Sequence, residues 1–181
     1  MKKIALVAGL AAAVAGTASA DVTYTFTNQT WAGFQFTDLS TAYGGFTGTL
    51  TGVSVAATLN ASTDYTYADD LCVYVDVAPL STGGLLQVGG FSNLNALQRL
   101  SWASGGSSAP GTTVISTKSV NAISFSGTSA DATIWLGNGY GTSGTSGTWT
   151  GSITLIGVDV VPAPGAIALV GLAGLAGRRR R

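Results

Sequence analysis

The chain has 181 residues and no net formal charge, with eight basic and eight acidic side chains, and it contains neither histidine nor glutamate. Catalytic sites that depend on histidine, as in serine hydrolases and most zinc enzymes, are therefore excluded. Six basic residues lie at the chain ends, so residues 21–161 carry eight aspartates against Arg99 and Lys118, a net charge of −6. This charge argues against nucleic-acid binding, which depends on neutralised phosphates.

The first twenty residues have the three parts of a secretory signal peptide. Lys2 and Lys3 form a positive start, residues 4–15 are apolar, and Ala18 and Ala20 are small residues of the cleavage-site type. We therefore expect export of the chain and cleavage before Asp21. A retained N-terminal membrane helix is the alternative.

Residues 21–160 are expected to form one extracellular domain built from strands. Thr, Ser, Gly, Val and aromatic residues dominate this part, and lysine, which is common on helix surfaces, is nearly absent. The alternation of Val22, Tyr24 and Phe26 with threonines is typical of a strand with one buried face. Strands are predicted at residues 22–27, 31–36, 46–59, 71–77, 85–88, 112–117, 120–125, 132–136 and 149–158. This pattern predicts an all-β protein, an antiparallel β-sandwich of the jelly-roll kind.

A helical pattern and a single cysteine stand out among the predicted strands. Leu94, Leu97 and Leu100 recur at helical spacing, so one or two helical turns are predicted over residues 93–100, with Asn93 as the cap. Cys72 is the only cysteine, and it lies in the alternating segment 71–77. We expect it to be a small packed side chain; a reactive thiol or an intermolecular disulfide is the alternative.

The acidic residues offer two kinds of site. With neither His nor Glu, a glycosidase would need two aspartates, but Asp69 and Asp70 are adjacent and, on a strand, would point to opposite faces. We therefore predict no catalytic residues. Asp64, Asp69, Asp70 and Asp76 could together hold Ca²⁺ with backbone carbonyls, although no EF-hand spacing is present and scattered surface aspartates are the alternative.

Aromatic residues in polar segments suggest carbohydrate binding, because a flat ring can stack on a sugar. The candidates are Tyr65, Tyr67, Trp102, Tyr140 and Trp149. The alternative is that Trp102 and Trp149 are core residues, which is the usual place of large aromatic side chains.

The chain ends with a short Pro-containing motif, an apolar run and four arginines. The motif is Pro162-Ala163-Pro164, the apolar run covers residues 165–177, and the basic residues are Arg178, Arg179, Arg180 and Arg181. As a helix the run would be about 20 Å long, short for a hydrocarbon core of about 30 Å. Because arginines resist translocation, they are expected to remain cytoplasmic. A core helix with a solvated basic tail is the alternative, and its three glycines disfavour it.

This tail resembles the PEP-CTERM sorting signal of bacterial exported proteins, although Ala163 stands where glutamate is usual. The resemblance implies a transient membrane anchor that exosortase, a membrane protease, cuts near Pro162–Pro164. It also implies the secretion machinery as a partner and an association with exopolysaccharide or biofilm. A second resemblance, to the β-jelly-roll P-domains beside secreted proteases, is based on the strand pattern around Gly48, Asp69-Asp70-Leu71, Gly89-Gly90 and 136–139.

Together these features predict an exported, exosortase-sorted, non-catalytic protein of the cell surface or extracellular matrix, with a structural or adhesive role. A carbohydrate-binding module is the second hypothesis. An accessory domain stabilised by calcium is the third.

Overall fold

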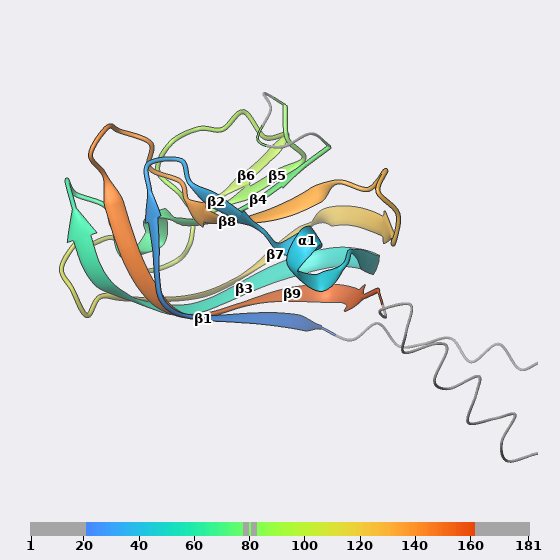
Figure 1. Cartoon of the computed structure of the whole chain (residues 1–181), viewed down its shortest axis with the longest axis horizontal. Helices are drawn as coiled ribbons and strands as arrows, with labels where there is room; N and C mark the ends of the chain where they lie inside the picture. The colour runs from blue at the N-terminus through green and yellow to red at the C-terminus, as the bar shows by residue number, and fades with distance from the viewer. Residues whose placement is uncertain (1–20, 78–79, 81–82, 162–181) are drawn as a thin grey trace, which may run out of the picture.

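The computed structural model describes residues 21–77, 80 and 83–161, which form a sandwich of two β-sheets (Figure 1). One sheet has four strands in the order β1 (Val22–Ala32), β9 (Ser146–Val160), β3 (Phe46–Thr63) and β7 (Thr113–Ser126). The other has five strands in the order β2 (Phe36–Asp38), β8 (Thr133–Asn138), β4 (Leu71–Asp76), β5 (Leu86–Val88) and β6 (Gln98–Leu100). All pairs are antiparallel except β5 and β6, which run parallel. The prediction of an all-β sandwich is confirmed.

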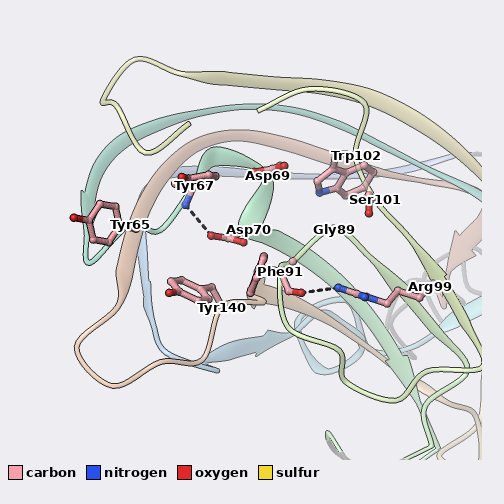
Figure 2. A pocket seen from close by; sticks show the side chains of 11 residues that line it. Tyr65, Tyr67, Asp69, Asp70, Gly89, Phe91, Arg99, Ser101, Trp102 and Tyr140 are labelled. Carbon is pink, nitrogen blue, oxygen red and sulfur yellow. Dashed lines mark hydrogen bonds between the residues drawn. The ribbon is translucent and has the colours of Figure 1, made fainter. Parts of the chain in front are cut away.

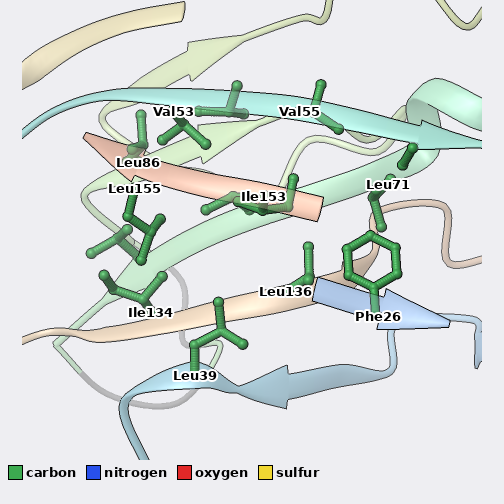
Figure 3. Packing of buried hydrophobic residues seen from close by; sticks show 14 of the residues in the cluster. Phe26, Leu39, Val53, Val55, Leu71, Leu86, Ile134, Leu136, Ile153 and Leu155 are labelled. Atoms are coloured by element: carbon green, nitrogen blue, oxygen red, sulfur yellow. The ribbon is translucent and has the colours of Figure 1, made fainter. Parts of the chain in front are cut away.

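The core lies between the sheets and is filled by aliphatic and aromatic side chains from both (Figure 3). In β1 the predicted alternation holds, since Val22 and Phe26 are buried while the threonines between them face solvent. In β9, Ile153 and Leu155 are fully buried. Burial of such side chains contributes about 1.5–3 kcal/mol each, so the period-two pattern determines which face of each strand turns inward.

All six residues of β4 are buried, so both faces of this strand are covered. Its inner face contacts the core, and its outer face is covered by loops, to which the Tyr74 hydroxyl donates a hydrogen bond at the Leu94 carbonyl (3.0 Å). Cys72 is fully buried here, as a packed side chain would be, and burial raises the pKa of its thiol, with the Asp70 charge adding to the effect. Cys72 is therefore held in the unreactive protonated form.

Several strand boundaries differ from those predicted. β1 does not stop at residue 27 but continues through a register shift between Phe26 and Gln29, where Asn28 has a positive φ of 48°. The strand predicted over residues 31–36 is wrong, because Trp31 and Ala32 are the last residues of β1 and a turn precedes β2. The strands predicted at 112–117 and 120–125 are one strand, β7. It stays paired with β3 on both sides of a register shift between Leu50 and Gly52.

The helix predicted over residues 93–100 is also wrong. Residues 98–100 form β6, and Asn95 has a positive φ of 58° that an α-helix does not allow. A short helix occurs instead at α1 (Leu39–Tyr43), where the Asp38 carboxylate accepts a hydrogen bond from the Thr41 amide (2.9 Å) and Gly44 ends the helix in the left-handed conformation. A 3₁₀ turn, η1 (Ala68–Asp70), precedes β4.

Candidate functional site

A hollow of about 590 Å³ opens at one end of the sandwich, within the size range of ligand pockets (Figure 2). Its walls come from five places: the turn after β3, the turn η1, the loop between β5 and β6, β6 with the segment that follows it, and the loop after β8. Its aromatic lining residues are Tyr65, Tyr67, Phe91, Trp102 and Tyr140. Its polar lining residues include Asp69, Asp70, Arg99 and Ser101.

Two of the aromatic rings stand out into solvent at the rim. Tyr65 is 78% exposed and Phe91 is 73% exposed. Phe91 packs edge-on against Tyr140, with ring centroids 5.6 Å apart. Tyr65 has a positive φ of 60°, a conformation rarely adopted by bulky residues, which is more often found at functional sites. Large rings are thus held at the mouth of the hollow rather than in the core.

The loop that carries Phe91 is fixed from below by a buried glutamine. Gln87 has no exposed surface, and its side-chain amide donates hydrogen bonds to the carbonyls of Gly89 (3.0 Å) and Ser92 (2.8 Å). Its side-chain oxygen accepts a hydrogen bond from the Leu94 amide (2.9 Å). One side chain therefore satisfies three backbone groups and determines the shape of the loop.

The tight start of this loop requires glycine. Gly89 has a φ of +79°, and a Cβ atom there would collide with the Leu71 carbonyl and the Trp102 indole nitrogen. Gly90 is also left-handed, and its amide donates to the Asp69 carbonyl (3.0 Å). The Gly89-Gly90 pair thus lets the loop turn back against η1 and brings Phe91 to the rim.

The peptide groups at Phe91 are bound by two charged side chains. Its carbonyl accepts a hydrogen bond from the Arg99 guanidinium (2.6 Å), drawn in Figure 2. Its amide is hydrogen-bonded to the Asp70 carboxylate, which also accepts a hydrogen bond from the Tyr67 amide (2.7 Å). Asp70 therefore joins the two walls that carry Tyr67 and Phe91.

Asp69 and Asp70 both line the hollow, which corrects the expectation that they diverge across a strand. They lie on the 3₁₀ turn η1, where successive side chains fan around an axis instead of alternating between two faces. Burial raises the pKa of Asp70 to about 6; the Asp69 charge adds to this rise, and the Tyr67 and Phe91 amides oppose it. Burial also raises the pKa of Asp69, which is only half-buried.

We expect Asp70 to make the protein less stable as the pH rises. Because its pKa is higher in the folded chain than the ordinary value of 3.8, the folded state holds the proton more tightly, and this stabilisation is lost between about pH 4 and pH 6. Between pH 4 and pH 7, the free energy of unfolding of the wild type should fall by about 2–3 kcal/mol more than that of Asp70→Asn, which cannot ionise. Urea unfolding at the two pH values measures both changes. Asp69→Asn, in which Asp70 is intact, should show most of the same pH-dependent fall in the free energy of unfolding. Parallel pH profiles for the wild type and Asp70→Asn would contradict the assignment.

The structure brings together four of the five aromatic residues predicted to bind sugar. Tyr65, Tyr67, Trp102 and Tyr140 line the hollow, but only the edge of Trp102 does so, since it is 6% exposed and its indole donates to the Leu71 carbonyl (2.6 Å). Trp149 is fully buried, and Trp102 also packs in the core, as the alternative held for both residues. Sequence reasoning missed Phe91, although the glycine pair before it is a turn signal that could have indicated an exposed ring.

The four aspartates considered for calcium do not gather in one place. Asp69 and Asp70 line the hollow, Asp64 lies in the turn after β3, and Asp76 is fully buried at the far end of β4. Within residues 21–77, 80 and 83–161, no three His, Cys, Asp or Glu residues are grouped so that they could hold a metal ion. Calcium binding stays a prediction from the sequence.

The signals predicted at the two chain ends lie almost wholly outside the described residues. Ala18 and Ala20 precede them, and the sorting residues Pro162 to Pro164 and Arg178 to Arg181 follow them. Asp21 is described, and its carboxylate accepts a hydrogen bond from the Gly157 amide (3.0 Å). In the part of the chain that the structure describes, no helix has the length and apolar character needed to cross a membrane.

Comparisons with protein-family models, with curated proteins and with solved structures each gave no match.

Proposed function

We propose that the chain is an exported, non-catalytic protein of the cell surface or extracellular matrix, whose β-sandwich binds neutral polysaccharide in the hollow and so has an adhesive role. The observation that carries this proposal is the rim of exposed aromatic rings, Tyr65 and Phe91, held on tightly bonded turns beside two carboxylates. The proposal therefore combines two hypotheses from the sequence: an adhesive protein of the cell surface or matrix, and a carbohydrate-binding module.

The chemistry of the lining suits a sugar. Aromatic faces stack on the C–H faces of a pyranose ring, and exposed rings on a rigid loop bind without first being ordered. The half-buried carboxylate of Asp69 can accept hydrogen bonds from sugar hydroxyls, and the Arg99 guanidinium has donors besides the one given to Phe91. Because the domain carries a net charge of −6, acidic polymers would be repelled and neutral ones favoured.

The same residues support a binding role rather than a catalytic one. A glycosidase built on aspartates needs one carboxyl as acid and a second as nucleophile or base, each free to reach the substrate. Asp70 is 4% exposed, and its carboxylate accepts hydrogen bonds from the Tyr67 and Phe91 amides. Its place in the structure is that of a support for the two walls.

The extracellular location of the protein and the jelly-roll class of its fold are part of the same proposal. A signal peptide ending at Ala20 and an exosortase-type tail from Pro162 would place the domain outside the cell, transiently anchored with the C-terminus in the cytoplasm. We class the sandwich as a jelly roll. In its support, every connection between successive described strands leads to the opposite sheet, except those from β4 to β5 and from β5 to β6.

Binding to a panel of neutral glucans, mannans and galactans, with polygalacturonate as the acidic comparison, tests this function. We expect retention by a neutral polymer, and Phe91→Ala and Tyr65→Ala should each weaken binding about five- to tenfold, since a ring contact is worth about 1 kcal/mol. Ile115→Ala is the matched control, because Ile115 is 67% exposed on β7 and does not line the hollow, so its loss should change nothing. No retention on any neutral polymer, or equal loss in the control, would refute the proposal.

A further inference from the structure

Both ends of the described chain leave the sandwich at the same end (Figure 1). Asp21 is bonded to the Gly157 amide, and the Val161 amide donates to the Gly45 carbonyl (3.1 Å). The register of the four-stranded sheet agrees, since Val160 at the end of β9 pairs with Phe46 at the start of β3. The tail that begins at residue 162 is therefore attached at this end.

The hollow lies at the opposite end. Thr63, the last residue of β3, pairs with Ser146, the first residue of β9. Tyr65 follows β3 by two residues, and Tyr140 lies in the loop that leads into β9. Between the two ends β9 runs for fifteen residues, which at about 3.3 Å per residue corresponds to a length of about 50 Å.

The body between the two ends is continuous. β9 is paired with β3 from Phe46 to Thr63 and with β1 from Val22 to Ala32, interrupted only by register shifts. β9 lies between β1 and β3, and β3 lies between β9 and β7, so these two strands are hydrogen-bonded on both sides, and the core lies beneath the sheet. Such a sheet is stiff and keeps its two ends at a fixed distance, because bending it would break many hydrogen bonds together.

We infer that the sandwich is a spacer that displays the hollow at the end farthest from its C-terminal attachment, so that a chain anchored by its tail presents Tyr65 and Phe91 to polysaccharide beyond the cell surface. This inference depends on the proposed function for its ligand. It adds a direction: the attached end and the binding end are separated by the full length of the strands. A tail that left beside Tyr140 would instead press the hollow against the membrane.

Tethering the purified protein in two orientations tests the direction. Cys72 has no exposed surface, so a maleimide–biotin reagent should react only with a cysteine introduced at an exposed serine. Ser129→Cys lies in the loop after β7, whose last residue Ser126 pairs with Thr47 at the tail end. Ser143→Cys lies in the loop between Tyr140 and β9, beside the hollow. Each variant is fixed to a streptavidin surface, and a third sample carries biotin after Arg181.

The probe is a bead coated with the neutral polysaccharide that the protein retains best, because a bead cannot enter beneath a tethered domain. We expect the Ser129→Cys and C-terminal tethers to capture at least about tenfold more beads than the Ser143→Cys tether, while all three bind a soluble oligosaccharide of the same polymer equally. Equal oligosaccharide binding with equal bead capture would overturn the inference and leave the proposed function standing. No binding of the oligosaccharide by any sample would refute the proposed function itself.

Discussion

Replacing Trp149 with alanine is expected to lower the free energy of unfolding by about 4 kcal/mol, the usual cost of removing a buried aromatic side chain. Trp149 lies on β9 with no exposed surface, and its ring centroid is 5.9 Å from that of Trp31. Its indole nitrogen donates a hydrogen bond to the Ala68 carbonyl of η1 (3.2 Å). The variant would therefore leave a cavity in the core and remove a link between the core and the turn that bears Asp69 and Asp70.

Urea unfolding followed by circular dichroism measures this effect, and two variants separate its parts. Trp149→Phe keeps a ring but loses the hydrogen bond to Ala68, so it should cost less than Trp149→Ala. Thr148→Ala changes the neighbouring residue, whose side chain points to the outer face, and should cost no more than about 1 kcal/mol. A loss below about 1 kcal/mol in Trp149→Ala would show that Trp149 is not a core residue in solution.

The strands could be predicted wherever side-chain alternation is local. In β1, buried Val22 and Phe26 alternate with exposed threonines, and the two-residue period is visible without knowledge of the partners. The sandwich follows from the number of such strands, because each must bury one face. The register shift at Phe26 and Gln29 could not be predicted, since it depends on which residues of β9 lie opposite.

Residues 93–100 show why the helical pattern was misleading. Leu94, Leu97 and Leu100 have helical spacing, but Leu97 is 83% exposed and Leu100 belongs to β6. The Leu94 amide donates a hydrogen bond to the Gln87 side chain, and β6 pairs with β5. Long-range hydrogen bonds therefore outweigh a weak local preference. Helix α1 was not predicted, because its five residues are too few to show a helical spacing of apolar side chains.

The candidate site could be predicted only in part. Tyr65, Tyr67 and Tyr140 lie in polar loops, so their exposure followed from composition. Phe91 is apolar and would ordinarily be assigned to the core, and its exposure results from hydrogen bonds made by Asp70 and Arg99. Such contacts join residues that are eight or more positions apart, and no local pattern indicates them.

Gln87 holds the loop that carries Phe91 by three hydrogen bonds, and Gln87→Met is expected to lower the free energy of unfolding by about 3 kcal/mol. Methionine has a similar length and keeps the packing, but it leaves the Gly89 and Ser92 carbonyls and the Leu94 amide without their partner. Each buried polar group that loses its hydrogen bond costs about 1–3 kcal/mol, and partial access of water to the loop reduces the sum.

The effect should reach the hollow, because the loop that presents Phe91 is no longer held in one shape. Hydrogen–deuterium exchange at the Leu94 amide should become faster in Gln87→Met, and binding of the neutral polysaccharide should weaken about tenfold or more as ordering of the loop is added to the cost of binding. Gln98→Met is the matched control: Gln98 is half-buried, and its side-chain oxygen accepts a hydrogen bond from the Asn121 amide on β7. It should lose about 1 kcal/mol and keep the affinity. If Gln87→Met instead retained both slow exchange and full affinity, the loop would owe its shape to the Asp70 and Arg99 contacts rather than to the buried amide.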